Sequence, residues 1–261
     1  MVMFYKSEYC TKDGTVHIYY SQIFGEQYEK LNQATQTLIT AMNEMDYCFI
    51  LLDSIKDFLS DCATNGVGVE KNFIRANRYL LNWLNSFYTW IEYHENNFKF
   101  VFSNLKKKYY EQSFSYRLAY NLRKYVTHCA LVITQFSYDV INETQNIQIF
   151  PSNILETEKG TLQASVRREL QERVANNISI DVVNLTRDFM EVFKNFQKDI
   201  WSSQENLICK ALNYISQFVP LTSPYCYNCV IISDDRSKCF PIGQILEKYI
   251  KKVQEISSYI D

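Results

Sequence analysis

The sequence is poor in residues that turn or break a chain, with 6 Gly and 4 Pro among its 261 residues. So few turn residues argue against a many-stranded barrel or sandwich, and the composition excludes a collagen-like or broadly disordered chain. Few glycines also leave little room for a loop that cradles phosphates, and the sequence contains no Walker A, Rossmann or nucleophile-elbow motif. The common nucleotide-binding and hydrolase families are therefore disfavoured.

Long apolar runs and a dominant charge are also lacking. The apolar stretch 48–52 ends well before the roughly 20 residues that a transmembrane helix needs. No basic region followed by an apolar run opens the chain, so we expect no signal peptide. The net charge of −2 gives no general attraction to nucleic acid or acidic membranes. We therefore expect a cytoplasmic protein with no membrane partner, in which the dispersed cysteines are small core residues.

Apolar residues at helical spacing are abundant. The clearest element runs from Glu26 to about Cys62, where large apolar residues recur every seven positions. These residues are Leu31, Leu38, Met45, Leu52 and Leu59. Such spacing predicts an amphipathic helix of about ten turns. Similar patterns predict helices from 69 into the nineties, over 98–129, 163–175 and 181–218, and from 242 onward.

Two short β-hairpins are predicted near the termini. The aromatic-rich runs 3–11 and 15–24 flank Asp13-Gly14, a strong two-residue turn signal, and a second hairpin is plausible over 227–240. Residues 142–160 are predicted to be a connection. The expected fold is mainly α, an antiparallel helical bundle with a small β-hairpin annex near the termini, in a single domain over 1–261.

One segment carries a strong local charge. Residues 99–124 contain seven Lys or Arg and one acid, so seven minus one gives +6 locally. Tyrosines and a phenylalanine interleave with these cations, and this combination suits single-stranded RNA, because cations bind phosphates and aromatic faces stack on unpaired bases. The alternative is a solvated basic face that pairs with acidic neighbours. The candidate RNA-binding residues are Lys106, Lys107, Lys108, Arg117, Tyr120, Asn121 and Lys124.

An arginine and a histidine lie five positions apart at the end of this segment, as Arg123 and His128. On an ideal helix they are about 140° and roughly 7.5 Å of rise apart, and both lie outside the apolar arc. A histidine near neutral pKa can take a proton from an RNA 2′-hydroxyl or return one to the leaving 5′-oxygen. An arginine can bind the phosphate with two N–H groups. This chemistry requires no metal or cofactor.

The Arg-x4-His motif and the long helices resemble the HEPN superfamily, over roughly residues 26–135. The resemblance implies that Arg123 is the phosphate ligand and His128 the acid–base group of a metal-independent endoribonuclease, of toxin–antitoxin or phage-defence type. It also implies a homodimer in which two motifs face one cleft, with an antitoxin protein as a further partner. HEPN proteins often have Asn, Asp or His after the arginine, whereas this chain has Lys124. Residues 136–261 would add further helices and the C-terminal hairpin.

Other interpretations remain open beside this one. The first two helices could build a non-catalytic interaction or dimerisation module, because one has a heptad-like stripe and the other is rich in aromatics. The spacing of Cys226, Cys229 and Cys239 suits zinc, but a fourth ligand is missing nearby, so we expect no metal site. His94 would join the Arg-x4-His motif in one cleft if the second and third helices packed antiparallel.

Overall fold

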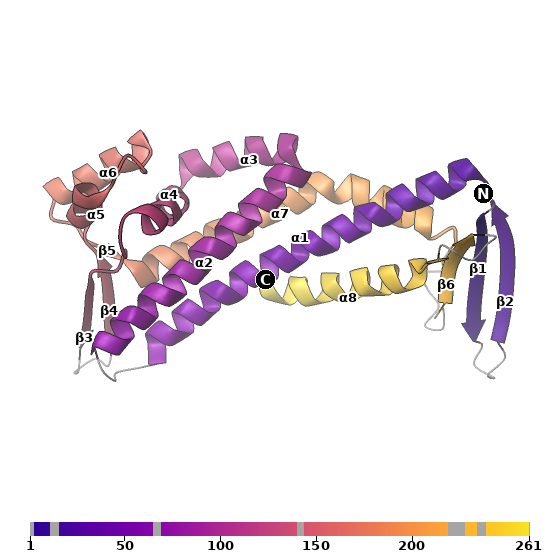
Figure 1. Ribbon diagram of the computed structural model, residues 1–261, viewed down its shortest axis with the longest axis horizontal. Coiled ribbons are helices and arrows are strands. Elements are labelled where there is room, and N and C mark those ends of the chain that lie inside the picture. Colours follow the sequence, from indigo (N-terminus) through magenta and orange to yellow (C-terminus); the bar gives the residue numbers. More distant parts are fainter. Residues whose placement is uncertain are drawn as a thin grey trace. The chain divides into compact units, whose positions relative to one another are not determined.

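The computed structural model describes residues 3–10, 16–64, 69–139, 144–218, 228–233 and 239–260. These ranges contain eight helices and seven short strands, which confirms the predicted mainly α fold (Figure 1). The helices are α1 Gly25–Thr64, α2 Val69–Asn97, α3 Lys99–Gln112, α4 Phe114–His128, α5 Pro151–Thr157, α6 Ala164–Ala175, α7 Val182–Ile215 and α8 Ile242–Ile260. The strands are β1 Met3–Cys10, β2 Val16–Ile23, β3 Gln135–Asp139, β4 Thr144–Ile149, β5 Ile180–Asp181, β6 Asn228–Ser233 and β7 Cys239–Phe240.

The chain divides into two compact units. Unit 1 consists of Met1–Asp46 and Trp201–Asp261, and unit 2 of Tyr47–Ile200. Both divisions fall inside long helices, α1 and α7. A single domain over 1–261 stays a prediction. No helix among the described residues combines the length and the apolarity needed to cross a bilayer.

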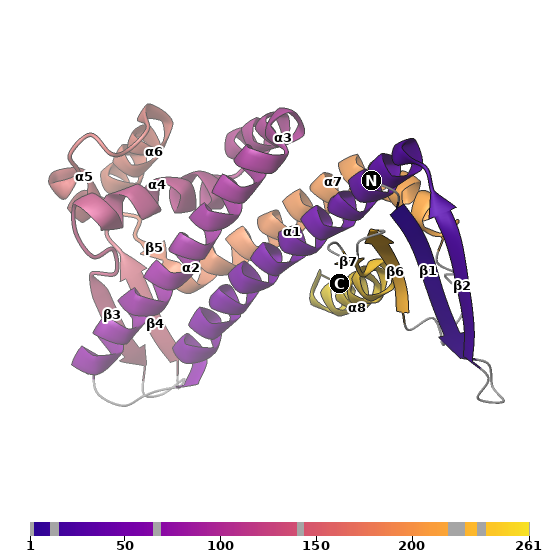
Figure 2. The same cartoon turned by 45° about the vertical axis from the view of Figure 1, so that its right-hand side comes forward.

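Unit 1 contains a four-stranded antiparallel sheet in the order β2-β1-β6-β7 (Figure 2). β1 pairs with β2 through Met3 and Ile23, and with β6 through Met3 and Ser233. The strands of both predicted hairpins are confirmed, and the N- and C-terminal segments join in one sheet. The predicted turn at Asp13-Gly14 lies outside the described residues.

The apolar stripe predicted for the first helix is the buried face of α1. Leu31, Leu38 and Leu52 are fully buried, Met45 is nearly so, and Leu59 is half-buried. A helix places residues seven apart on one face, so this spacing alone fixed which side of α1 meets the core.

Unit 2 is organised around α2. Trp90 of α2 donates its indole N–H to Oε1 of Gln197 on α7 at 3.0 Å, and Ser86 hydrogen-bonds Ser54 of α1 at 3.0 Å. Large buried aromatic side chains from α2, α3, α4 and α7 fill the space between these helices. They include Phe87, Trp90, Phe102, Tyr116, Phe189 and Phe196.

The predicted helical segment 98–129 is two helices, because the chain breaks at Ser113. This residue has an extended backbone, with φ −123° and ψ 121°. Its hydroxyl oxygen accepts a hydrogen bond from the backbone N–H of Tyr116 at 3.2 Å and so caps α4. The periodicity continues across the break, so it could not show where α3 ends.

The connection predicted over 142–160 is wrong, since part of it is regular structure. β4 pairs antiparallel with β3 and with β5, which gives unit 2 a three-stranded sheet, and α5 follows at Pro151. Ile147 and Ile149 are buried and Asn146 is exposed, the alternation typical of a half-buried strand. The strand is short and rich in Thr, Gln and Asn, which weakened that signal.

Candidate nucleic-acid interface

Two lysines of the basic segment bind acids of neighbouring helices. Lys106 Nζ lies 2.5 Å from Glu95 Oε1 of α2, and Lys108 Nζ lies 2.7 Å from Asp199 Oδ2 of α7. Burial acts to lower the pKa of Lys106, but the hydrogen bond to Glu95, the negative charge of that carboxylate and the Tyr120 hydroxyl together raise the pKa above its usual value. A hydrogen bond from Lys108 holds the pKa of Asp199 below its usual range. Burial acts in the opposite direction, and a hydrogen bond from the Tyr109 hydroxyl lowers the pKa further. These contacts join α3 to α2 and α7.

Arg117 donates most of its guanidinium hydrogen bonds within the protein. Its Nη2 lies 2.5 Å from Glu169 Oε1 of α6, and its Nη1 donates to the carbonyl oxygens of Tyr110 and Glu111, each at 2.8 Å. Only 13% of the Arg117 side chain is exposed. The side chain therefore joins α4 to α6 and has little capacity left for RNA.

Asn121, another predicted RNA-binding residue, is buried and structural. It donates to the carbonyl oxygen of Arg117 and accepts from the backbone N–H of Gln163, both at 2.8 Å. Lys107 behaves differently, because 78% of its side chain is exposed and its ion pair with Glu111 within α3 is loose at 3.9 Å.

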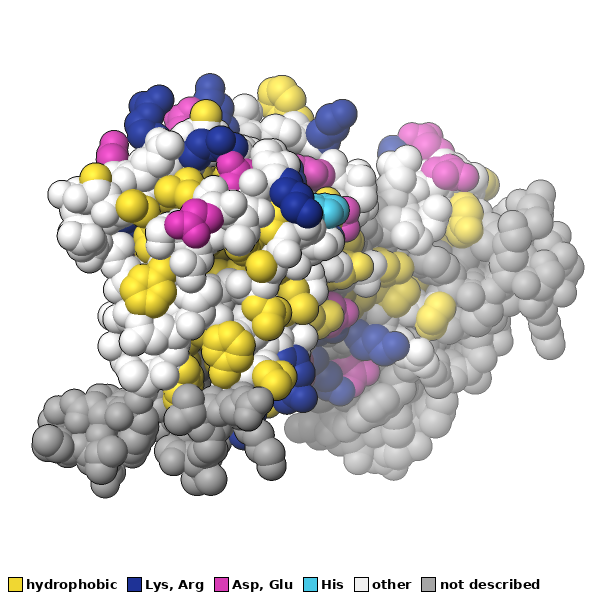
Figure 3. Space-filling model, turned by 60° about the vertical axis from the view of Figure 1, so that its left-hand side comes forward, with side chains coloured by type: hydrophobic (Ala, Val, Ile, Leu, Met, Phe, Trp, Pro, Cys, Tyr) yellow, Lys and Arg dark blue, Asp and Glu magenta, His cyan; other side chains and the backbone are white. Residues whose placement is uncertain are grey.

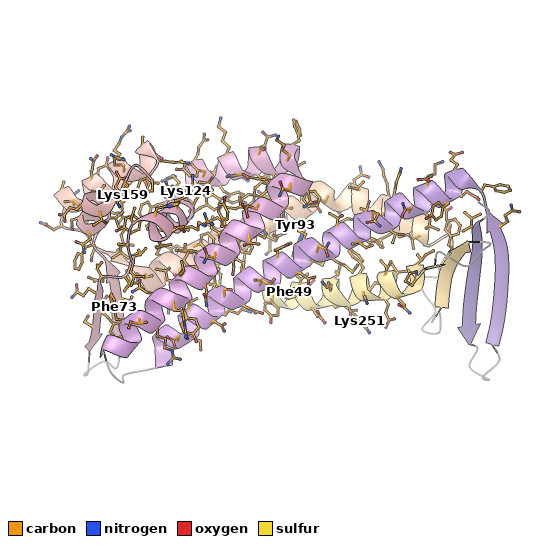
Figure 4. All side chains as sticks on the ribbon, viewed as in Figure 1. Phe49, Phe73, Tyr93, Lys124, Lys159 and Lys251 are labelled. Carbon is orange, nitrogen blue, oxygen red and sulfur yellow. The ribbon has the colours of Figure 1, made fainter. Side chains whose placement is uncertain are left out.

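Tyr120 lies between two cations on the α4 surface. The Nζ atoms of Lys106 and Lys124 are 4.7 Å and 5.6 Å from the centroid of its ring. Lys124, labelled in Figure 4, makes no ion pair with any described residue. In Figure 3, Lys and Arg side chains are interspersed with Asp and Glu side chains on the face that comes forward.

Arg123 lies over an aromatic ring and makes no ion pair with the described residues. Its Cζ lies 3.8 Å from the centroid of the Tyr88 ring of α2. Its Nε is buried and has no hydrogen-bond partner among the described residues. His128 is exposed in the last turn of α4. Within the ranges that the structure describes, Arg123, Lys124 and His128 have no acidic partner, and we call these three residues the unpaired group.

The structure does not bring the side chains of Arg123 and His128 into contact within one chain. α4 is continuous between them, and Cys129 N–H still donates to the Tyr125 carbonyl oxygen at 2.8 Å. The two side chains therefore keep the separation of a regular helix, about 140° around its axis. A phosphodiester bound to both would have to lie across the end of α4.

His94 lies away from this surface. It is fully buried, stacks on Phe102 with ring centroids 5.2 Å apart, and its Nδ1 lies 2.8 Å from the Trp90 carbonyl oxygen. The expectation that His94 could join the motif in one cleft is therefore wrong. No group of His, Cys, Asp or Glu among the described residues could hold a metal ion. Cys226, of the discounted zinc motif, lies outside the described residues.

Tyr88 is a residue of this site that the sequence did not reveal. Burial raises its pKa, and Glu92 raises it further, both as a nearby negative charge and by a side-chain hydrogen bond. Tyr88 is half-buried between the core positions Phe87 and Trp90. The only available signal was its place at the edge of the apolar stripe of α2.

No protein-family model matches the chain, and no curated protein or solved structure matches it. Its function must therefore be inferred from the chemistry of its own residues, above all from the unpaired group of α4.

Proposed function

We propose that the chain is a HEPN-like RNA-binding protein whose phosphate-binding site is the C-terminal half of α4. One observation carries this proposal: Arg123, Lys124 and His128 have no acidic partner among the described residues, whereas Lys106, Lys108 and Arg117 each bind an acid of another helix. Cations that are not neutralised within a protein attract phosphates and release the counterions condensed on nucleic acid. The overall charge of −2 makes this local site the basis of binding.

The same residues support metal-independent cleavage of the RNA. Arg123 would bind the scissile phosphate and stabilise its developing charge. His128 would take the proton of the 2′-hydroxyl as the 2′-oxygen attacks phosphorus, or return a proton to the 5′-oxygen as the P–O5′ bond breaks. The products would be a 2′,3′-cyclic phosphate and a free 5′-hydroxyl, so atoms and protons balance without a metal.

A second copy of the chain would complete this site. One histidine cannot both take and give a proton in the same step, and Arg123 and His128 point in different directions on α4. A homodimer whose two α4 ends face one cleft supplies both groups, as the HEPN resemblance implies. A toxin–antitoxin or phage-defence role, with an antitoxin protein as partner, belongs to the same proposal.

The test is cleavage of single-stranded RNA in the presence of EDTA. We expect the purified chain to cut the RNA and the variant His128→Ala to lose at least about a hundredfold in rate, the usual contribution of a general acid or base. His128 is exposed, so its removal should leave the helical circular dichroism unchanged. Lys251→Ala removes an exposed cation of α8 in unit 1 and is the matched control, expected to cut normally.

Two results would separate binding from cleavage. Equal cutting by the wild type and His128→Ala would remove the catalytic assignment. RNA binding without cutting would leave a phosphate-binding HEPN-like scaffold, in keeping with Lys124 at the position where HEPN proteins often have Asn, Asp or His.

A non-catalytic interaction module is the second candidate, and a pocket in unit 1 favours it. The pocket has a volume of about 400 Å³ and is lined by α1, α7 and α8. Its apolar lining includes Met45, Trp201, Ile208, Leu212, Tyr249 and Val253. If the chain neither binds nor cuts RNA and Ile208→Glu dissociates a dimer, this second function replaces the first.

A further inference from the structure

We propose that Tyr88 of α2 is the positioning residue for Arg123, holding its guanidinium flat so that the edge of the group faces a phosphate. This inference rests on the proposed function and names a residue that the Arg-x4-His motif does not contain. It is carried by the 3.8 Å separation between Arg123 Cζ and the centroid of the Tyr88 ring.

The stacked geometry leaves the hydrogen-bonding groups of the arginine free. A guanidinium donates in its own plane, so a ring stacked against its face does not compete for its N–H groups. The Arg123 guanidinium makes no hydrogen bond to the described residues, in contrast to that of Arg117, whose N–H groups bind Glu169 and two carbonyl oxygens. Since Nε of Arg123 is buried, the terminal Nη1 and Nη2 are the atoms that would reach a phosphate.

Glu92 lies close to the ring without neutralising the arginine. It lies one helical turn beyond Tyr88 on α2, and burial and the nearby Glu92 charge raise the pKa of the Tyr88 hydroxyl. Arg123 makes no ion pair with Glu92 or with any other acid that the structure describes. A carboxylate bound to Arg123 would occupy the atoms that a phosphate needs.

The stack also restricts the arginine before any ligand arrives. An arginine side chain has many rotamers, and ordering them on binding reduces affinity. A cation held over a tyrosine face is stabilised by electrostatic attraction to the ring, so this ordering occurs on folding. Removing the ring should therefore weaken phosphate binding even though Tyr88 itself does not touch the RNA.

The experiment compares Tyr88→Leu with Tyr88→Phe in the full chain. The first readout is the affinity for a short single-stranded uridine oligonucleotide. The second readout is the NMR signal of the Arg123 Nε–Hε group, which is assigned by its loss in the variant Arg123→Lys. Tyr88→Leu is expected to weaken oligonucleotide binding about fivefold, the size of a partly exposed cation–π contact, and to abolish protection of Hε from exchange. Tyr88→Phe keeps the ring and should restore both.

Tyr79→Leu is the matched control, because Tyr79 also lies on α2 beneath two arginines, with Arg78 Cζ 5.1 Å and Arg75 Cζ 5.9 Å from its ring centroid. We expect it to change neither readout. If the wild type fails to bind the oligonucleotide, the proposed function fails. The exchange protection of Arg123 Hε then tests by itself whether Tyr88 holds the Arg123 guanidinium. Unchanged Hε protection in Tyr88→Leu, or equal losses in Tyr88→Phe and Tyr88→Leu, would overturn the role of Tyr88.

Discussion

The basic segment has a first part, residues 99–117, and a second part, residues 118–124, whose cations lie in different environments. In the first part, Lys106, Lys108 and Arg117 each bind a carboxylate from another helix. In the second part, the charged groups of Arg123 and Lys124 lie against aromatic rings and pair with no described acid. The first part holds helices together, and the second part has positive charge to offer a ligand.

This difference shows why a local charge count is a poor guide to a binding surface. The segment counts +6, but the acids that neutralise Lys106, Lys108 and Arg117 come from α2, α7 and α6, up to 91 residues away in the sequence. A cation is available to bind a ligand only when the fold leaves it without such a partner. By that criterion Lys106, Lys108 and Arg117 leave the candidate site, and the end of α4 stays in it.

Arg117 and Glu169 form the least exposed ion pair of the basic segment, so its loss should destabilise the fold more than the other changes considered below. Glu169→Gln removes the charge opposite Arg117, which is 13% exposed, and leaves that arginine partly buried without its carboxylate. We expect a loss of about 2 kcal/mol in the free energy of unfolding, less than for a fully buried pair. Urea denaturation followed by circular dichroism measures it.

The exposed pair Lys251–Glu247 on α8 provides the control. Both side chains are more than half exposed, so Glu247→Gln should change the free energy of unfolding by less than about 0.5 kcal/mol. If Glu169→Gln were equally mild, Arg117 would not be a structural residue, and its place among the RNA-binding candidates would have to be restored.

The contacts of Asp199 with Lys108 and Tyr109 should make the stability of the fold depend weakly on pH. Because Lys108 and Tyr109 lower the pKa of Asp199 in the folded state, this group adds stability above its unfolded pKa of about 4 and loses it as pH falls through the lower folded value. The pair is partly exposed, so the contribution should be about 0.5 kcal/mol. In Asp199→Asn, the loss of stability between neutral pH and about pH 3 should shrink by that amount. An unchanged pH dependence would show that Lys108 does not stabilise the fold through Asp199.

Much of the fold could be predicted because its signals are periodic. The seven-residue spacing in α1 and the strands flanking Asp13-Gly14 depend only on nearby residues. The Ser113 break and β4 were missed, since one depends on a single capping hydroxyl and the other is a six-residue polar strand. Such short features carry little sequence signal.

The candidate site was predictable only in part, for a related reason. Arg123 and His128 were found by their spacing, which is local. The acids that bind Lys106, Lys108 and Arg117, and the ring that orients Arg123, lie on other helices. No pattern along one helix can reveal a partner that tertiary packing supplies.

The salt dependence of RNA binding distinguishes the unpaired cations of α4 from the ion-paired cations before them. Each lost phosphate contact lowers the slope of log K against log salt by about 0.7 for a single strand, so Arg123→Ala/Lys124→Ala should lower it by about 1.4. The matched double variant Lys106→Ala/Lys108→Ala removes the same number of cations from the ion-paired first part of the basic segment and should leave the slope unchanged. A slope that falls in the second variant and not in the first would contradict the account.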